Sequence, residues 1–366
     1  MITFFSVKNF RQFKDELVFD FSSIRDYQFN TEGVKNEVVN KAIIYGKNAV
    51  GKTSLMEAMR DIYFTTRGRF PFPDRSYKNA DSDEGEPISF HYSFKLDGVN
   101  IDYKYKKRDT TTVIAEKLAI NNKIIFDYDR EQDRYDFANV GIIGAEKLQW
   151  DVFKNINICE DDAELIESLT ALRFVYNNTA IAENTPFKKL IRFIYRMRFN
   201  TEIGTVNSTL AMRLLLGEQE KGVNDNVQKF ESFLNEYGID CKLVALPEAD
   251  GKIKLFFDYK KPLDFFENMS SGTKLLTTFY LQFINNAVPP SFVFIDEFDA
   301  FYHYELSEKI VNLLEKEFDC QVILTTHNTN LLSNSIMRPD CFMILHDGKI
   351  TPLFKATSRE LRRGII

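Results

Sequence analysis

The chain has 366 residues, of which 44% are hydrophobic and 27% charged, a composition that excludes a disordered or collagen-like protein and allows a sizeable core. No stretch approaches the roughly 18 apolar residues of a membrane helix, and the N-terminal residues lack the zones of a signal peptide. Four cysteines without C-x-x-C spacing predict reduced thiols in a cytoplasmic protein. With 47 Lys and Arg against 53 Asp and Glu, the net charge is −6, so any contact with nucleic acid requires a local basic patch.

The first part of the chain alternates strand patterns with one helical pattern. The stretches 2–7 and 16–21 read as paired strands. Later strand patterns are separated by turn signals at Asp97-Gly98 and Asn121-Asn122, which predict hairpins. The further predicted strands are 41–45 and several between 88 and 128, and the predicted helix covers 53–63.

The middle of the chain is helical and polar, whereas apolar strands flanked by helices occur at both ends. We therefore expect an α/β body made of residues 1–140 and 241–366, split by a mainly helical insertion over 141–240. The predicted helices are 161–174, 187–199, 224–237, one that begins at 270, 304–318 and one after 325; the predicted strands are 241–246, 252–259, 292–295, 322–325 and 341–345.

Residues 46–53 read Gly-Lys-Asn-Ala-Val-Gly-Lys-Thr and fit the motif G-x-x-x-x-G-K-[ST] between a predicted strand and a predicted helix. Glycines let consecutive N–H groups face phosphates, and the following helix adds its positive N-terminal end. Lys52 is expected to reach the β- and γ-phosphate oxygens, and the Thr53 hydroxyl to bind Mg²⁺. A chance glycine-rich turn is the weaker interpretation. The residues expected to hold the nucleotide are Gly46, Asn48, Ala49, Val50, Gly51, Lys52, Thr53 and Ser54.

The apolar strand 292–295 ends in two carboxylates, Asp296 and Glu297. Because α/β sheets bind ligands at the carboxyl ends of their strands, Asp296 is predicted to lie beside Mg²⁺. Glu297 is then a candidate general base that polarises an attacking water. The alternative, an acidic pair that only caps a helix, is weaker in a chain that also contains the phosphate-binding motif.

Two further residues have an ordinary and a functional interpretation. Ser270 opens a predicted helix, and taken alone it is an N-cap. His327 follows the apolar strand 322–325. A lone histidine is more often structural than catalytic, although one at the end of a sheet strand is well placed to sense a γ-phosphate.

Together and in order, these residues resemble the ABC-type ATPase heads of the SMC, RecF and OLD group. More narrowly, they are similar to the stand-alone AAA-family ATPases of bacterial anti-phage systems such as PARIS and Septu. The resemblance covers about residues 1–130 and 240–350. It implies an α/β P-loop ATPase head with a mixed sheet, flanking helices, an antiparallel β subdomain and a helical insertion.

The resemblance also implies roles for single residues. The segment 7–13 is similar to the N-F-R-x-F strand turn of the family, in which Arg11 would approach the nucleotide. Residues 269–273 match the signature loop, where Ser270 contacts the γ-phosphate across a dimer and Gly272 lies behind it. Residues 298–300 correspond to the D-loop, and His327 to the switch histidine. Thr273 departs from the glutamine of transporters, and no Q-loop glutamine is identified.

By this resemblance the protein is an ATPase that uses ATP and Mg²⁺ and forms a homodimer or higher oligomer. Two heads would sandwich two nucleotides, and hydrolysis would weaken the dimer. Without coiled coil or a nuclease cluster in the sequence, effector chemistry is expected in a separate protein of Toprim, HNH or HEPN type, within an anti-phage defence complex. Two alternatives remain open: a RecF-like DNA-repair protein gated by ATP, and an ATP-bound scaffold with little turnover.

Three groups of basic residues are candidates for contacts with DNA or with an effector. Each group also has an interpretation that involves no partner. Lys188, Arg192 and Arg196 recur at i, i+4 and i+8, which is typical of one helix face, and a solvated face is favoured. Lys104 and Lys106 share a face of a Tyr-rich strand, where protection of a sheet edge is favoured. A third group, near the C-terminus, is either a docking site or a frayed helical end and contains Arg359, Arg362 and Arg363.

Overall fold

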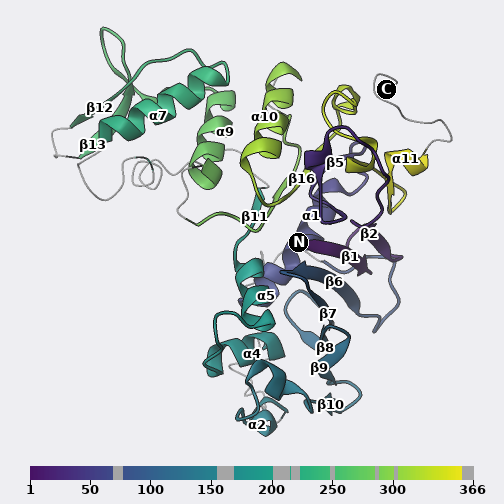
Figure 1. The fold of residues 1–366 in the computed structure, drawn as a ribbon. Helices are drawn as coiled ribbons and strands as arrows, with labels where there is room; N and C mark the ends of the chain where they lie inside the picture. Colours follow the sequence, from purple (N-terminus) through teal and green to yellow (C-terminus); the bar gives the residue numbers. More distant parts are fainter. Residues whose placement is uncertain are drawn as a thin grey trace. The chain divides into compact units, whose positions relative to one another are not determined.

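The chain forms two compact units (Figure 1). Unit 1 contains Met1–Phe199, Ser291–Glu297 and Glu315–Ile366, and unit 2 contains Asn200–Pro290 and Phe298–Leu314. The structure, a computed structural model, describes residues 1–68, 77–154, 169–200, 215, 223–247, 252–284, 288–300 and 304–356. The C-terminal arginines and most of the predicted helix 161–174 lie outside these ranges.

Seven strands of unit 1 form an antiparallel sheet in the order β10-β9-β8-β7-β6-β1-β2. The predicted pairing of residues 2–7 with 16–21 is confirmed as β1 against β2. Asp97-Gly98 and Asn121-Asn122 form the predicted turns, and all four residues have the positive φ of a two-residue hairpin turn. The strands are β1 Ile2–Lys8, β2 Leu17–Asp20, β6 Ile88–Leu96, β7 Val99–Lys107, β8 Val113–Ile120, β9 Lys123–Asp129 and β10 Arg134–Asp136.

Strand β7 shows how the two faces of this sheet differ. Tyr103 and Tyr105 are buried, while Lys104 and Lys106 are exposed on the opposite face, as the alternation predicts. The interpretation of these lysines as protection of a sheet edge is wrong, because β7 pairs with β6 on one side and with β8 on the other. Alternation assigns a residue to a face but contains no information about strand order.

A second sheet of unit 1 has six strands in the order β11-β15-β16-β5-β17-β18. Strands β15, β16, β5 and β17 are parallel, so their carboxyl ends meet at one edge. Strand β18, which the sequence analysis did not predict, pairs antiparallel with β17 through the turn Asp347-Gly348. The strands are β11 Met197–Asn200, β15 Phe292–Ile295, β16 Gln321–Thr326, β5 Lys41–Tyr45, β17 Phe342–His346 and β18 Lys349–Pro352.

The edge strand β11 replaces the end of a predicted helix. Instead of continuing over 187–199, helix α5 ends at Tyr195, and β11 begins at Met197. Met197 is buried, and the ring of Phe199 lies 5.6 Å from that of Phe292 in β15. Pairing with a strand that is distant in the sequence thus overrides the local helical pattern.

The helices of unit 1 are mostly short, and the helix predicted after residue 325 is only a 3₁₀ turn, η5. The remaining elements of unit 1 are η1 Thr31–Gly33, β3 Val34–Lys35, β4 Val38–Val39, α1 Lys52–Thr65, η2 Val140–Ile143, α2 Trp150–Lys154, α4 Ala171–Asn178, α5 Pro186–Tyr195, η5 Thr329–Leu331, η6 Pro339–Cys341 and α11 Leu353–Ala356.

Unit 2 combines helices with a three-stranded antiparallel sheet in the order β12-β13-β14. Within the described ranges of both units, none of the helices has the length and apolar character that crossing a bilayer requires. The elements of unit 2 are α7 Val223–Glu236, β12 Leu243–Pro247, β13 Ile253–Phe257, β14 Leu263–Asp264, α8 Phe265–Asn268, α9 Ser271–Phe279, the π-helical turn η4 Tyr280–Ile284 and α10 Tyr304–Glu317, whose last turn belongs to unit 1.

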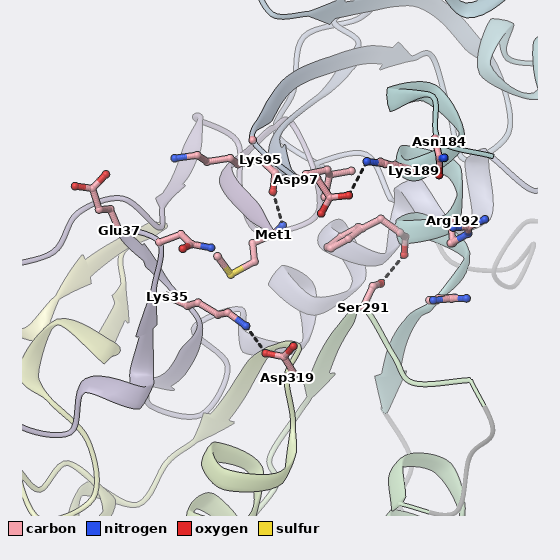
Figure 2. Close-up of a pocket in the computed structure, with 15 residues that line it drawn as sticks. Met1, Lys35, Glu37, Lys95, Asp97, Asn184, Lys189, Arg192, Ser291 and Asp319 are labelled. Atoms are coloured by element: carbon pink, nitrogen blue, oxygen red, sulfur yellow. Dashed lines mark hydrogen bonds and ion pairs between the residues drawn. The ribbon is translucent and has the colours of Figure 1, made fainter. Parts of the chain in front are cut away.

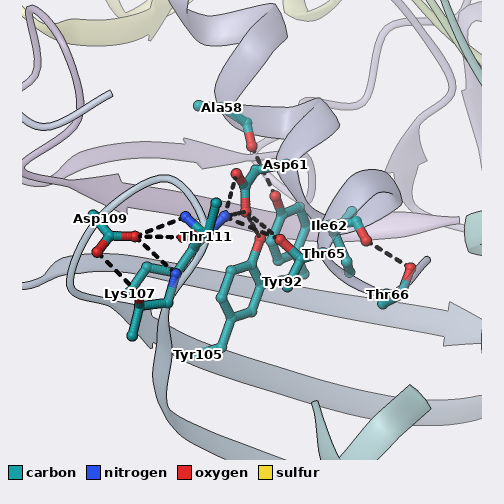
Figure 3. A network of polar contacts seen from close by, with 11 residues as sticks. Ala58, Asp61, Ile62, Thr65, Thr66, Tyr92, Tyr105, Lys107, Asp109 and Thr111 are labelled. Carbon is teal, nitrogen blue, oxygen red and sulfur yellow. Dashed lines mark hydrogen bonds and ion pairs between the residues drawn. The ribbon is translucent and has the colours of Figure 1, made fainter. Parts of the chain in front are cut away.

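Helix α1, which follows the predicted phosphate-binding loop, is held against the antiparallel sheet by a buried polar network (Figure 3). The Lys107 ammonium lies 2.9 Å from the Asp61 carboxylate, and both side chains are buried. Tyr105 donates to the same carboxylate at 2.8 Å, and Tyr92 donates to the Ala58 carbonyl at 2.8 Å. Burial raises the pKa of both tyrosines, so their hydroxyl groups stay protonated as donors.

We expect Lys107→Met to lower the free energy of unfolding by about 3–5 kcal/mol, because it leaves the buried Asp61 carboxylate without its cation. The double variant Lys107→Met/Asp61→Asn should recover part of this loss, and Lys106→Met, on the exposed face, should change stability by less than about 0.5 kcal/mol. Urea unfolding curves measure all three. A Lys107→Met protein as stable as Lys106→Met would contradict the assignment.

Candidate nucleotide-binding site

The loop between β5 and α1 has the backbone shape that the motif predicts. Gly51 has φ 105° and Ala49 has φ 64°, both in the left-handed region, so the chain curls tightly before α1 begins at Lys52. A Cβ atom added at Gly46 would meet Val50 Cγ2 at 2.8 Å, which explains the glycine at the start of the loop. Such a curl turns successive N–H groups in one direction and makes an anion-binding concavity.

The Lys52 side chain is buried within this loop. Its ammonium group donates to the Gly46 carbonyl at 2.9 Å and to the Lys47 carbonyl at 3.1 Å. The same nitrogen lies 3.8 Å from Glu297 Oε1, at the end of β15. The folded chain therefore brings together the lysine of one motif and a carboxylate of the other, as their strand contexts predict.

Thr53 and Asp296, the two predicted metal ligands, are in direct contact. The Thr53 hydroxyl donates to Asp296 Oδ2 at 2.5 Å. A hydroxyl and a carboxylate oxygen are hard donors of the kind that Mg²⁺ prefers, usually with several waters and phosphate oxygens completing its octahedron. This donor pair fits Mg²⁺ at the junction of the two motifs.

Thr325, in β16, fixes both carboxylate residues and was not predicted. Its hydroxyl donates to Asp296 Oδ1 at 2.5 Å and accepts from the Glu297 backbone N–H at 2.8 Å. Glu297 has φ 46°, a left-handed conformation that costs a non-glycine residue on the order of 1–3 kcal/mol and persists only where its surroundings enforce it. The Glu297 side chain is half exposed and free to face a ligand.

The turn at residues 9–13 packs against the loop, as expected for a segment that approaches the nucleotide. The ring of Phe13 lies 3.0 Å from the position of a Cβ atom at Gly51. Ser54 donates a hydrogen bond from its hydroxyl to Gln12 Oε1. Gln12 was not singled out from the sequence, although it occupies the variable position of the N-F-R-x-F pattern.

Arg11 is engaged on the outer side of the same turn. Its guanidinium group forms an ion pair with Glu57 of α1 and lies 5.2 Å from the centre of the Tyr77 ring. With φ 48°, its backbone is also left-handed. Arg11 is thus close to the helix that begins at the loop, and its approach to a nucleotide stays a prediction.

His327 directly follows β16, at the sheet edge where β5 and β15 also end. Its side chain is exposed, and its ring has no hydrogen-bond partner within the described part of the chain. The contact of this imidazole with a γ-phosphate stays a prediction.

Ser270 and Gly272 belong to unit 2. The Ser270 hydroxyl accepts from the Thr273 N–H at 3.1 Å and therefore caps α9, so the capping role is confirmed. A Cβ atom added at Gly272 would meet Ser270 Oγ at 3.9 Å, which is ordinary contact, so packing within the described residues does not require this glycine. In the segment 298–300, which is predicted to be the D-loop, Phe298 is buried.

Comparisons with known proteins show the family and the fold of the chain. Residues 41–333 match the family AAA_21, described as "AAA domain, putative AbiEii toxin, Type IV TA system". No curated protein matches the sequence.

Among solved structures, an SMC head bound to the C-winged helix domain of ScpA is similar at 12% identity and a TM-score of 0.50, with 97% of this chain and 99% of that chain covered. The SMC head domain from Thermotoga maritima aligns at 13% identity and a TM-score of 0.41, covering 96% and 98%. An SMC head domain derived from Pyrococcus furiosus, with an extended coiled coil and bound to the C-terminal domain of ScpA, aligns at 14% identity and a TM-score of 0.45, covering 97% of each chain.

The family match covers most of the chain, and the first structural match shows a shared fold. The predicted resemblance to AAA and ABC-type ATPase heads is therefore confirmed at the level of family and fold. The chain belongs to the AAA_21 family and has the α/β fold of an SMC-like P-loop ATPase head.

Proposed function

We propose that the protein hydrolyses ATP as the ATPase subunit of a bacterial anti-phage defence complex, and that nucleotide-bound dimers control a separate effector of Toprim, HNH or HEPN type. The observation that carries the ATPase part is the convergence of Lys52, Thr53, Asp296 and Glu297 at one sheet edge. The defence role is supported by the resemblance of the motif set and by the toxin–antitoxin description of the family. Residues 1–140 and 241–366 are taken as the head, and 141–240 as its insertion.

In this mechanism the loop 46–51 binds the β- and γ-phosphates through its N–H groups, and Lys52 neutralises their charge. Thr53 and Asp296 would hold Mg²⁺, which would supply further charge neutralisation when bound. Glu297 orients a water and accepts its proton, while Thr325 keeps the carboxylate in position.

The proposed dimer uses groups from both copies. Lys52 of one copy binds the triphosphate, and Ser270 at the N-terminus of α9 in the other copy contacts the γ-phosphate, with Gly272 allowing close approach. His327 senses the same phosphate. Since the γ-phosphate then interacts with both copies, ATP favours the dimer and hydrolysis weakens it.

Glu297→Gln should lower the rate of ATP hydrolysis by about 10²–10⁴, because it removes the general base while leaving the phosphate-binding loop intact. Lys52→Ala should abolish ATP binding itself. Phosphate release and binding of a fluorescent ATP analogue measure the two effects, with the exposed Glu146→Gln as control. Unchanged turnover in Glu297→Gln would refute the base assignment. Assembly that needs ATP and Lys52 but proceeds with negligible turnover in the unmodified protein would favour the scaffold alternative.

Thr325→Val should reduce turnover by roughly 10- to 100-fold, because it removes the hydroxyl that orients Asp296 and the Glu297 backbone. Thr325→Ser keeps that hydroxyl and should retain most of the activity. Steady-state rates are measured across a range of Mg²⁺ concentrations. A loss that high Mg²⁺ restores indicates weaker Mg²⁺ binding, and a loss that it does not restore indicates a misplaced general base. Equal activity of the valine and serine variants would show that the hydroxyl does not position these groups.

A mixture of inactive variants tests whether each site combines two copies. Ser270→Asp preserves the N-cap of α9 but repels a γ-phosphate, so it should be inactive without unfolding, as should Lys52→Ala. Mixed in equal amounts, the two form mixed dimers with one intact site, and activity should return to about a quarter of that of the unmodified protein if the sites act independently. A mixture no more active than its separate components would exclude the shared site.

A further inference from the structure

Unit 1 contains a cavity of about 870 Å³ that does not include any residue of the phosphate-binding loop or of the strand ends beside it (Figure 2). It lies where α5, the turn between β6 and β7 and the first residue before β15 come together. Its volume falls within the range of pockets that hold small organic ligands. The cavity is therefore large enough for a ligand of its own.

The charges around this cavity are opposite in sign to the net charge of the chain. Five basic side chains line it against three acidic ones, whereas the whole chain carries a net charge of −6. A concave surface of one sign attracts and concentrates ligands of the other sign. The basic residues are Lys35, Lys95, Lys189, Arg192 and Arg196, and the acidic residues are Glu37, Asp97 and Asp319.

Some of the basic side chains that line the cavity form ion pairs, and others are available to bind an anion. Lys189 lies 2.7 Å from Asp97, and Lys35 pairs with Asp319, as Figure 2 shows. Lys95 has no carboxylate within ion-pair distance in the described ranges, and the same holds for the guanidinium group of Arg196. These two cations, from different elements, are the ones that an anionic ligand would neutralise without breaking an ion pair. Arg192 pairs with Glu183, which is exposed and does not line the cavity.

The end of α5 is held rigidly next to the cavity. Ser291 donates from its N–H to the Arg196 carbonyl at 3.2 Å and from its hydroxyl to the Phe193 carbonyl at 2.5 Å. Arg192 and Arg196 are one helical turn apart and both line the cavity. Guanidinium groups are suited to phosphate, which they bind with charge-assisted hydrogen bonds.

The cavity also has an apolar part. Phe193 and Leu96 line it, and both are largely buried with only a small exposed area. Apolar side chains next to basic ones match a molecule with a flat ring at one end and a phosphate at the other.

We propose that this cavity binds a small phosphorylated molecule of the size of a mononucleotide, at a second site distinct from the phosphate-binding loop. Arg196 and Arg192 bind its phosphate, for which Arg192 leaves the exposed Glu183, while Lys95 adds positive charge to the cavity, and Phe193 and Leu96 contact its ring. Lys188, on the same helix, takes no part, because it does not line the cavity and lies beside the Tyr176 ring.

The test uses the full chain carrying Lys52→Ala, so that binding at the phosphate-binding loop does not interfere. Calorimetric titration with AMP should give measurable binding, and inorganic pyrophosphate, which lacks the ring, should bind more weakly. Arg192→Gln/Arg196→Gln and, separately, Lys95→Gln should weaken AMP binding by at least about tenfold, a fold-change typical of removing charge-assisted bonds to phosphate. Lys188→Gln is the matched control and should bind as the parent does.

Three results would overturn the proposal: no binding of either probe up to millimolar concentration, AMP binding that is unaffected by the arginine and Lys95 substitutions, or tighter binding of a single-stranded oligonucleotide with the same dependence on these residues. Thermal unfolding checks that each variant is folded, which is expected because Arg192 pairs only with the exposed Glu183. This test is independent of the proposed ATPase activity. The binding of AMP is measured in a Lys52→Ala protein, so it can succeed even if the unmodified protein does not hydrolyse ATP.

Discussion

The hydrogen bond from Thr53 to Asp296 joins two parts of the chain that lie 243 positions apart, and the candidate nucleotide site is built around this junction. Strand order makes this contact possible. β16 lies between β5 and β15 in a parallel arrangement, with Thr326 opposite Tyr45 and Leu324 opposite Ile295. β5 and β16 therefore end at the same level and β15 ends two residues earlier, so the residues that follow the three strands lie close together.

Thr325 has its role because β16 is the middle strand of this group. Its hydroxyl lies beside the residues that follow β15, where it binds the Asp296 carboxylate and the Glu297 backbone. A small polar side chain at this register satisfies two groups that would otherwise need water. The left-handed backbone of Glu297 is thus supported from the neighbouring strand, and this support keeps a candidate base at a fixed distance from Lys52.

The antiparallel sheet contributes to the same site through α1. Its buried tyrosines and Lys107 bind the face of α1 that is turned away from solvent, so the helix that begins at Lys52 cannot easily rotate. Buried polar networks of this kind define one arrangement strongly when all members are satisfied. The sheet is therefore a support for the loop and not only a source of buried apolar area.

Most strands and the phosphate-binding loop could be predicted, because alternation and motif spacing are local signals. Thr325 and Gln12 could not, because their contacts depend on which strands and turns become neighbours in space. Strand β11 was predicted as helix for the same reason, since its pairing with β15 is not visible in residues 187–199. The position of β7 between β6 and β8 could not be predicted either, and for this reason the interpretation of Lys104 as protection of a sheet edge was wrong.

The basic residues along and just after α5 show that a shared helical face in the sequence does not give its members the same surroundings. Lys188, Arg192 and Arg196 share a predicted face, yet only the two arginines line the cavity, while Lys188 and Arg192 both lie near Glu183. Duplex DNA is bound by cations that follow its backbone over a long open surface. Arg192 and Arg196 line a cavity, and Glu183 lies beside both Arg192 and Lys188, so the three cations do not form such a surface. This weighs against the RecF-like alternative on this helix.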